Sequence, residues 1–301
     1  MDLLERLMWL PSVRRDTHRM RHTMLWCWLV VAFAAMTTTA TELKPATAAG
    51  FAQYVRATEA RMDDDVRQDR FLVVDRLSEP RRREAYDELR RGGIYVEPLR
   101  TRDDNTTIHV ASGLIHHWAG VIFIRGGTLS EALVVLQDYE HQQQIYSPDI
   151  RESRLIERNG DQSTIFLQLF NKSVVVVILN AEFDVSDTQF GSIRHQIAFR
   201  STRIAEIAHP GRPDEHELPV GNDHGYMWRL DTYWRIEEKD GGVYIQNESL
   251  ALTRTVPILL AWLVNPLIKN LPRNVLFRLL TATRRAIVKD SAVNSEQASV
   301  Y

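Results

Sequence analysis

A run of short extended segments joined by turn signals fills the middle of the chain, and it limits the possible folds most. Asn159-Gly160 is the strongest hairpin signal in the sequence. Asp240-Gly241 marks a second two-residue turn between two alternating segments. The sequence therefore predicts consecutive antiparallel strands over residues 150–158, 162–170, 173–185, 193–208, 225–238 and 242–253.

Helical segments flank these strands. Residues 114–124 form one more β-rich segment, and Thr128 then caps a helix with apolar residues at helical spacing. After the last strand, residues 256–288 are helical and apolar, with breaks at Pro266 and Pro272. This order is α+β and lacks the alternation of a parallel α/β sheet. We expect a curved antiparallel seven-stranded sheet that grips the long C-terminal helix.

The first 40 residues have the order of a secretory signal. A basic run precedes the apolar segment Met24–Met36, and small residues follow it. We expect residues 1–40 to be a signal peptide with its n-region, cleaved after Ala40 or Ala48, and the mature protein to be periplasmic or extracellular. An uncleaved anchor is the alternative, although the strongly apolar part is shorter than the roughly 20 residues of a spanning helix. The single cysteine, Cys27, lies here, which excludes an intramolecular disulfide.

Residues 41–112 are predicted to form a helical N-terminal extension. Ser78 is the predicted N-cap of a helix that begins at Glu79-Pro80. The segment is polar and has too few apolar residues for a core of its own, so we expect it to pack on a main domain over residues 113–290. Residues 291–301 are expected to be a disordered tail.

Charge and motifs exclude several function classes. The chain has 37 Lys and Arg residues against 39 Asp and Glu, for a net charge of -2. A nucleic-acid-binding protein would carry a basic excess, so no nucleic-acid partner is expected. The sequence has no G-x-S-x-G, P-loop, G-x-G-x-x-G or H-E-x-x-H motif. No second ligand stands at metal-binding spacing from His224, and neither a metal nor a cofactor is expected.

Three stretches carry a resemblance to a known superfamily: GLIHHWAG (113–120), STRIAEI (201–207) and PVGNDHGYMWRLDTYWRIEEKDGGVYIQNESLALTR (219–254). Together with the order of elements over residues 113–288, they resemble a group of bacterial proteins, without an assigned function, in the START-like, helix-grip superfamily. This superfamily includes lipid-transfer domains, the birch-pollen allergen family and polyketide cyclases. The resemblance implies a hydrophobic cavity between the sheet and the last helix. Because the superfamily has no shared catalytic motif, it implies no catalytic residue.

Side chains alternate across a strand, so the last two strands divide into two faces. The more apolar set is assigned to the interior: Tyr226, Trp228, Leu230, Thr232, Trp234, Ile236, Val243, Ile245, Asn247, Ser249 and Ala251. The other set is assigned to solvent: Arg229, Asp231, Tyr233, Arg235, Glu237, Gln246 and Glu248. A turn at Gly241-Gly242 in place of Asp240-Gly241 would keep both sets unchanged.

Polar residues on the predicted interior face are the candidate ligand contacts. Thr232, Asn247 and Ser249 pair with each other or with buried water, or else they orient a ligand. The same alternation points Arg203 inward, as a structural ion pair or as a ligand anchor. His116 and His117 are adjacent, so one of them faces inward, and the sequence does not choose between them. The candidate ligand-binding residues are Arg203, Tyr226, Trp228, Thr232, Trp234, Asn247, Ser249 and His117.

These features predict an exported START-like protein that binds or carries a lipid or other hydrophobic small molecule in the cavity. The apolar run Val256–Val264 is expected to be the lid of that cavity, and transient contact with a membrane surface is a further expectation. One alternative is a cyclase- or aromatase-type enzyme that acts on a hydrophobic carbonyl substrate with an inward His and Arg203. Another is an interaction module whose cavity is filled by its own side chains. The sequence indicates neither the ligand nor an oligomeric state.

Overall fold

The computed structural model describes residues 41–103, 106–172, 176–255 and 271–298. Residues 41–301 form one compact unit. The predicted signal segment 1–40 and the predicted lid within residues 256–270 lie outside the described residues. Expectations about these two segments therefore remain predictions.

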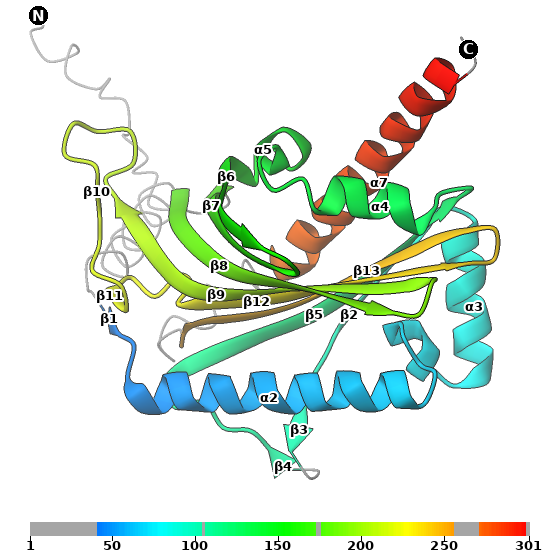
Figure 1. Cartoon of the computed structure of the whole chain (residues 1–301). Coiled ribbons are helices and arrows are strands. Elements are labelled where there is room, and N and C mark those ends of the chain that lie inside the picture. The colour runs from blue at the N-terminus through cyan, green and yellow to red at the C-terminus, as the bar shows by residue number, and fades with distance from the viewer. Residues whose placement is uncertain (1–40, 104–105, 173–175, 256–270, 299–301) are drawn as a thin grey trace, which may run out of the picture. The chain divides into compact units, whose positions relative to one another are not determined.

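A nine-stranded antiparallel sheet is the centre of this unit (Figure 1). Its strands follow the order β2-β5-β13-β12-β9-β8-β7-β6, with β10 paired to β9. The bounds are β2 Ile94–Pro98, β5 Gly113–Arg125, β6 Ile150–Asn159, β7 Gln162–Lys172, β8 Val176–Phe190, β9 Arg194–Ala208, β10 His216–Glu217, β12 Arg229–Lys239 and β13 Gly242–Arg254. The seven predicted strands are all present, and the α+β fold class is confirmed. β2 from the N-terminal extension and the short β10 are additions that the sequence did not predict.

Two short ladders lie outside this sheet. β1 Thr41–Glu42 pairs with β11 Asn222–Asp223, and β3 Arg102–Asp103 pairs with β4 Thr106–Thr107. The first ladder ties the start of the extension to the loop before β12.

The predicted hairpin between β12 and β13 forms in the expected register. Lys239 pairs with Gly242, so Asp240 and Gly241 are the two turn residues. Their φ angles are 57° and 72°, the left-handed values that a type I′ turn requires at both central positions. This turn fixes which residues of the two strands share a face.

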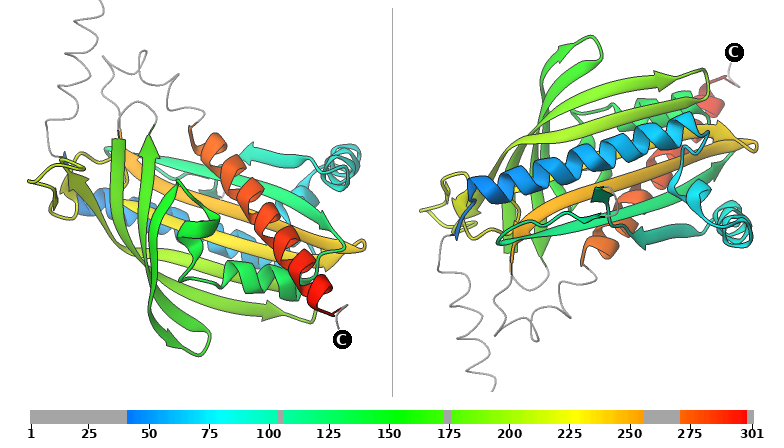
Figure 2. Two further views of the ribbon diagram at one scale, coloured as in Figure 1. Left: turned by 90° about the horizontal axis from the view of Figure 1, so that it is seen from above. Right: turned by 90° about the horizontal axis from the view of Figure 1, so that it is seen from below.

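The helices divide between the two faces of the sheet, which we call the inner and the outer face (Figures 1 and 2). α4 Leu129–Leu136 and α7 Leu271–Ala298 pack on the inner face, with α5 Gln142–Ile145 beside α7. α2 Pro45–Arg67, the 3₁₀-helix η1 Val73–Arg76 and α3 Glu79–Arg90 pack on the outer face. α7 continues to Ala298, into the segment that the sequence predicted as a disordered tail.

The close contact between α7 and β5 depends on a glycine. A Cβ atom at Gly120 would lie 2.6 Å from Cδ1 of Leu280 and 3.2 Å from Leu276. A side chain at this position would separate the helix from the strand. The glycine therefore allows α7 to lie directly on the inner face.

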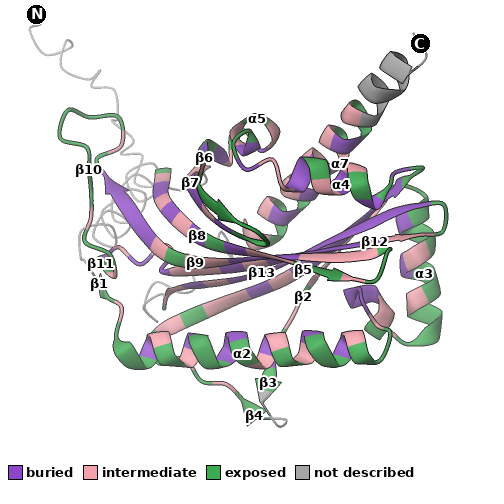
Figure 3. Ribbon diagram, viewed as in Figure 1, coloured by how far each residue is buried: buried purple, intermediate pink, exposed green. Residues whose placement is uncertain are grey.

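Contrary to the prediction from the sequence, the outer face of the sheet is not exposed to solvent. Residues assigned to solvent are buried under the N-terminal helices: Tyr233 and Glu248 are 0% exposed, and Arg235 is 2% exposed. The buried residues of α2, which face the sheet in Figure 3, include Phe51 and Tyr54. The alternation separated the two faces of these strands, but it could not show that a helix covers the polar one.

A network of hydrogen bonds fastens α2 to the outer face. Glu248 on β13 accepts hydrogen bonds from His117 Nε2 at 2.8 Å and from Arg61 of α2. The Tyr54 hydroxyl, also from α2, is 2.9 Å from His117 Nδ1 and accepts the Thr101 backbone N–H at 2.8 Å. These buried groups satisfy one another, which a packed charged interface requires.

Candidate functional site

Burial on the inner face changes from row to row along the strands. Rows of directly opposed residues run across β12, β13 and β5. The first row is 0% exposed, the second, where α7 packs on Gly120, is buried, and the last two are half-buried. In that order the rows are Ile236, Ile245 and Ile122; Trp234, Asn247 and Gly120; Thr232, Ser249 and Trp118; and Leu230, Ala251 and His116. We call the six residues of the last two rows the inner-face patch.

One polar pair lies at the edge of this patch. Asn247 Nδ2 donates to the Thr232 hydroxyl at 3.0 Å, and the two side chains face each other across neighbouring strands. The Thr232 hydroxyl lies 3.2 Å from Asn247 Oδ1 and 3.3 Å from the Glu248 carbonyl oxygen. Of the alternatives left open by the sequence, mutual pairing accounts for Asn247, while Ser249 remains half-buried beside the pair.

A Glu–His pair lies at the same end of the sheet as the patch. Glu206 shares a strand face with Ile204, which packs in the inner-face core. Its carboxylate accepts hydrogen bonds from the backbone N–H of His224 at 3.2 Å and from His224 Nδ1. Burial raises the pKa of Glu206, and the hydrogen bond and charge of His224 partly oppose that rise.

Tyr226 stands next to this pair. Its ring centroid is 5.6 Å from the His224 ring, with the planes tilted by 32°. Gly225 accepts a backbone hydrogen bond from Arg254, and Trp228 donates one to Leu252, so residues 225–228 run beside the end of β13. The predicted contact Tyr226 and the unpredicted pair are therefore neighbours of the patch.

Arg203 does not point inward. Ser201 pairs with Phe183 and Arg203 pairs with Glu182, which leaves Thr202 as an extra residue on β9. This bulge reverses the alternation, so Ile204 faces the inner core and Arg203 faces the outer side. The Arg203 side chain is 34% exposed and forms ion pairs with Glu217 and, at 4.0 Å, with Glu182. The predicted inward orientation is wrong because of the bulge.

His117 and Trp228 also lie on the outer side. His117 is the buried histidine of the network under α2, and Trp228 packs with Tyr233 and Leu250 in the cluster that α2 covers. Trp228 Nε1 donates to Asp223 at 3.0 Å. The assignment of Trp228 to the inner face is wrong, and His117, a candidate ligand contact, is the histidine of the adjacent pair that faces outward. His116 is the inward histidine and belongs to the patch, and its Nε2 is 3.1 Å from the Thr253 hydroxyl.

The remaining predicted contacts do lie on the inner face. Trp234 and Asn247 are buried there, and Thr232 and Ser249 belong to the patch. Whether they contact a ligand stays a prediction. No signal in the sequence identified Glu206, because simple alternation without the bulge placed it on the opposite face.

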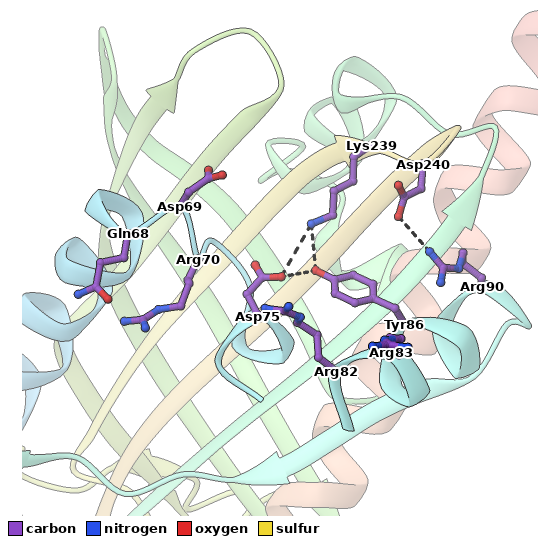
Figure 4. Close-up of a pocket in the computed structure, with 10 residues that line it drawn as sticks. All are labelled: Gln68, Asp69, Arg70, Asp75, Arg82, Arg83, Tyr86, Arg90, Lys239 and Asp240. Carbon is purple, nitrogen blue, oxygen red and sulfur yellow. Dashed lines mark hydrogen bonds and ion pairs between the residues drawn. The ribbon is translucent and has the colours of Figure 1, made fainter. Parts of the chain in front are cut away.

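A separate hollow of about 440 Å³ lies between α3, residues 68–75 and the β12–β13 turn (Figure 4). In its centre, Lys239 Nζ donates to the Tyr86 hydroxyl at 2.9 Å, and that hydroxyl donates to Asp75. Burial, followed by the charge of Asp75, raises the pKa of Tyr86. The lining includes Arg82, Arg83 and other charged side chains of both signs, so this hollow does not fit a hydrophobic ligand.

Among the residues that the structure describes, no group of three or more His, Cys, Asp or Glu side chains is placed to hold a metal ion. None of the helices in the described ranges is long and apolar enough to cross a membrane.

Several solved structures resemble this chain at low sequence identity. A fragment of the STAR-related lipid transfer protein from Xanthomonas axonopodis is 15% identical, with a TM-score of 0.41, over 64% of this chain and 98% of that chain. Human STARD10 is 14% identical, with a TM-score of 0.39, over 75% of this chain and 85% of that one. Zhui aromatase/cyclase from Streptomyces sp. R1128 is 12% identical, with a TM-score of 0.37, over 60% and 94%.

These scores are too low to carry an argument about function. No family model and no curated protein matches the sequence. The START-like, helix-grip fold predicted from the sequence is seen in the topology itself: a curved antiparallel sheet with the C-terminal helix on its inner face.

Proposed function

We propose that this protein binds or carries a lipid or another hydrophobic small molecule on the inner-face patch. The observation that supports it is the change in burial along the rows. The inner face is fully buried where α7 packs on it and only half-buried at Trp118 and Leu230. These half-buried residues offer a ligand a surface that is continuous with the core. The Thr232–Asn247 pair supplies a few fixed polar groups, as ligand sites commonly do.

The cyclase-type alternative has less support. It relied on an inward His and on Arg203; His116 does face inward, but Arg203 lies on the outer side. Binding without chemistry uses only features that the inner face has.

Lipid extraction and mass spectrometry of the natively purified protein test the proposal. We expect a hydrophobic molecule in stoichiometric amounts. Ser249→Trp adds bulk to the centre of the patch and should remove most of the bound molecule. Thr188→Trp adds the same bulk at an exposed position of β8 and should not. A wild-type protein that retains no lipid and binds no apolar dye would contradict the proposed function.

We also propose that the mature protein is exported and makes transient contact with a membrane surface. The basic, apolar and small-residue order of residues 1–40 supports export. N-terminal sequencing of natively expressed protein tests it: a mature start near Thr41 or Ala49 is expected, and an intact N-terminus in the cytoplasmic fraction would contradict it.

A further inference from the structure

The Glu206–His224 pair has one polar atom without a partner. His224 Nδ1 and its backbone N–H both bind the carboxylate of Glu206. Nε2 of the same ring has no hydrogen-bond partner among the described residues, and the His224 side chain is 22% exposed. A ring that is held at one nitrogen and open at the other is positioned to bind a group from outside.

With this pair included, the inner face changes from apolar to polar along the direction of the strands. The two buried rows come first, the half-buried patch follows, and polar side chains gather at its far edge. Those polar side chains are His116 with Thr253, Tyr226, and the Glu206–His224 pair. A ligand that fits this order is apolar along most of its length and polar at one end.

The chemistry of the pair limits the polar end. Glu206 is 4% exposed and its carboxylate is engaged by His224, so it is not free to pair with a cationic headgroup. Arg203 lies on the outer side with its own carboxylate partners, and Arg254, beside Tyr226, is already engaged in another interaction. Neither is a free charge for an anionic headgroup. A hydroxyl group suits the site because it donates to a neutral imidazole and accepts from a protonated one.

We infer that His224 Nε2, oriented by Glu206, hydrogen-bonds the hydroxyl end of an amphipathic ligand whose apolar part lies on the inner-face patch. This inference rests on the proposed function and names the ligand class: a long-chain or polycyclic alcohol. His224 is the recognition residue of this site, Glu206 positions it, and no reaction is implied.

The test compares two probes that differ at one end. 1-Octanol and 1-fluorooctane have similar size, but only the alcohol forms a strong hydrogen bond. Their affinities are measured by displacement of the dye 1-anilinonaphthalene-8-sulfonate from the full chain. The two probes gain nearly the same affinity from burial of their apolar chains. The ratio of their affinities therefore measures the contribution of the hydroxyl group.

His224→Phe keeps an aromatic ring beside Tyr226 and removes both ring nitrogens, Nε2 and the Nδ1 that binds Glu206. We expect it to reduce the preference for the alcohol by about three- to tenfold, the range of one hydrogen bond, with 1-fluorooctane binding within about twofold of wild type. His209→Phe is the matched control, because His209 pairs with Asp214 at 2.6 Å on an exposed loop. This variant should leave the ratio unchanged.

Two other results would overturn the inference. An unchanged ratio in folded His224→Phe would show that Nε2 does not contact the ligand, while dye and 1-fluorooctane binding would leave the proposed function standing. Failure of the dye and both probes to bind wild type would contradict both. If the single variant does not fold because Glu206 loses its partner, the double variant Glu206→Gln/His224→Phe gives the same comparison without an unpaired carboxylate.

Discussion

Glu248→Gln should lower the free energy of unfolding by about 3 kcal/mol at pH 7, and most of this loss should disappear in acid. Burial raises the pKa of the Glu248 carboxyl, but the charge of Arg61 and the hydrogen bond from His117 outweigh it and lower the pKa to about 2 from 4.5. Each pKa unit corresponds to about 1.4 kcal/mol. Because Gln resembles the protonated carboxyl in shape, the variant removes the contribution of the charged form.

The pH dependence has a definite sign. A carboxyl whose pKa is depressed in the folded state stabilises the protein above its unfolded value of 4.5 and loses this contribution as the pH falls toward 2. At pH 3, about 2 kcal/mol of the difference between wild type and variant should be gone. Other carboxyl groups also titrate, but they do so in both proteins and cancel in the comparison.

Urea unfolding at pH 7 and pH 3 measures this difference. Glu84→Gln, at an exposed position of α3, is the control and should change stability by no more than about 0.5 kcal/mol at either pH. A wild-type-to-variant difference that is the same at both pH values would refute the reasoning. It would mean that Glu248 is not a charged anchor for α2.

Three further substitutions test the packing, each by urea unfolding. Tyr233→Ala should cost about 3 to 5 kcal/mol, because this side chain is 0% exposed and its hydroxyl donates to Glu59 at 2.8 Å; a loss below about 1 kcal/mol would mean that α2 does not cover it. Gly120→Ala should cost about 1 to 3 kcal/mol through its clash with Leu280, and an unchanged midpoint would place α7 farther from β5. Gly241→Ala should cost about 1 kcal/mol because φ is 72° there, whereas a neutral result would argue against the type I′ turn.

The sequence was sufficient for the architecture because its signals are local. Turn residues such as Asp240-Gly241 set the hairpins, and the alternation on β12 and β13 placed Trp234 and Ile236 correctly on the face under α7. The same alternation could not identify what covers the other face. α2 has apolar residues at helical spacing, but its polar interface with Arg235 and Glu248 reads as a solvated surface until the two are brought together.

Single-residue irregularities in the strands limited how well the sequence could predict the residues of the candidate site. One extra residue, Thr202, exchanges the two faces of β9 from Arg203 onward. Nothing in the surrounding sequence marks a bulge there. The reversal removed Arg203 from the inner face and brought Glu206 to it. Similarly, Trp228 precedes the regular part of β12 and leaves the alternation that Leu230 follows. The residues most relevant to binding were therefore those that strand periodicity placed least well.

Polar groups on the two faces differ in how many of their hydrogen bonds are made within the protein. We expect fully bonded groups to contribute to stability and partly bonded groups to contribute to ligand binding. Under α2, Glu248 and His117 are each held by more than one partner from the chain, so removing a partner leaves a buried group unpaired and costs stability. At the open end of the inner face, His224 is held at one ring nitrogen only, within the part of the chain that the structure describes. Loss of its second nitrogen removes no hydrogen bond between described residues. Substitutions such as His117→Ala should therefore shift the unfolding midpoint, whereas a change confined to His224 Nε2 should act on ligand affinity.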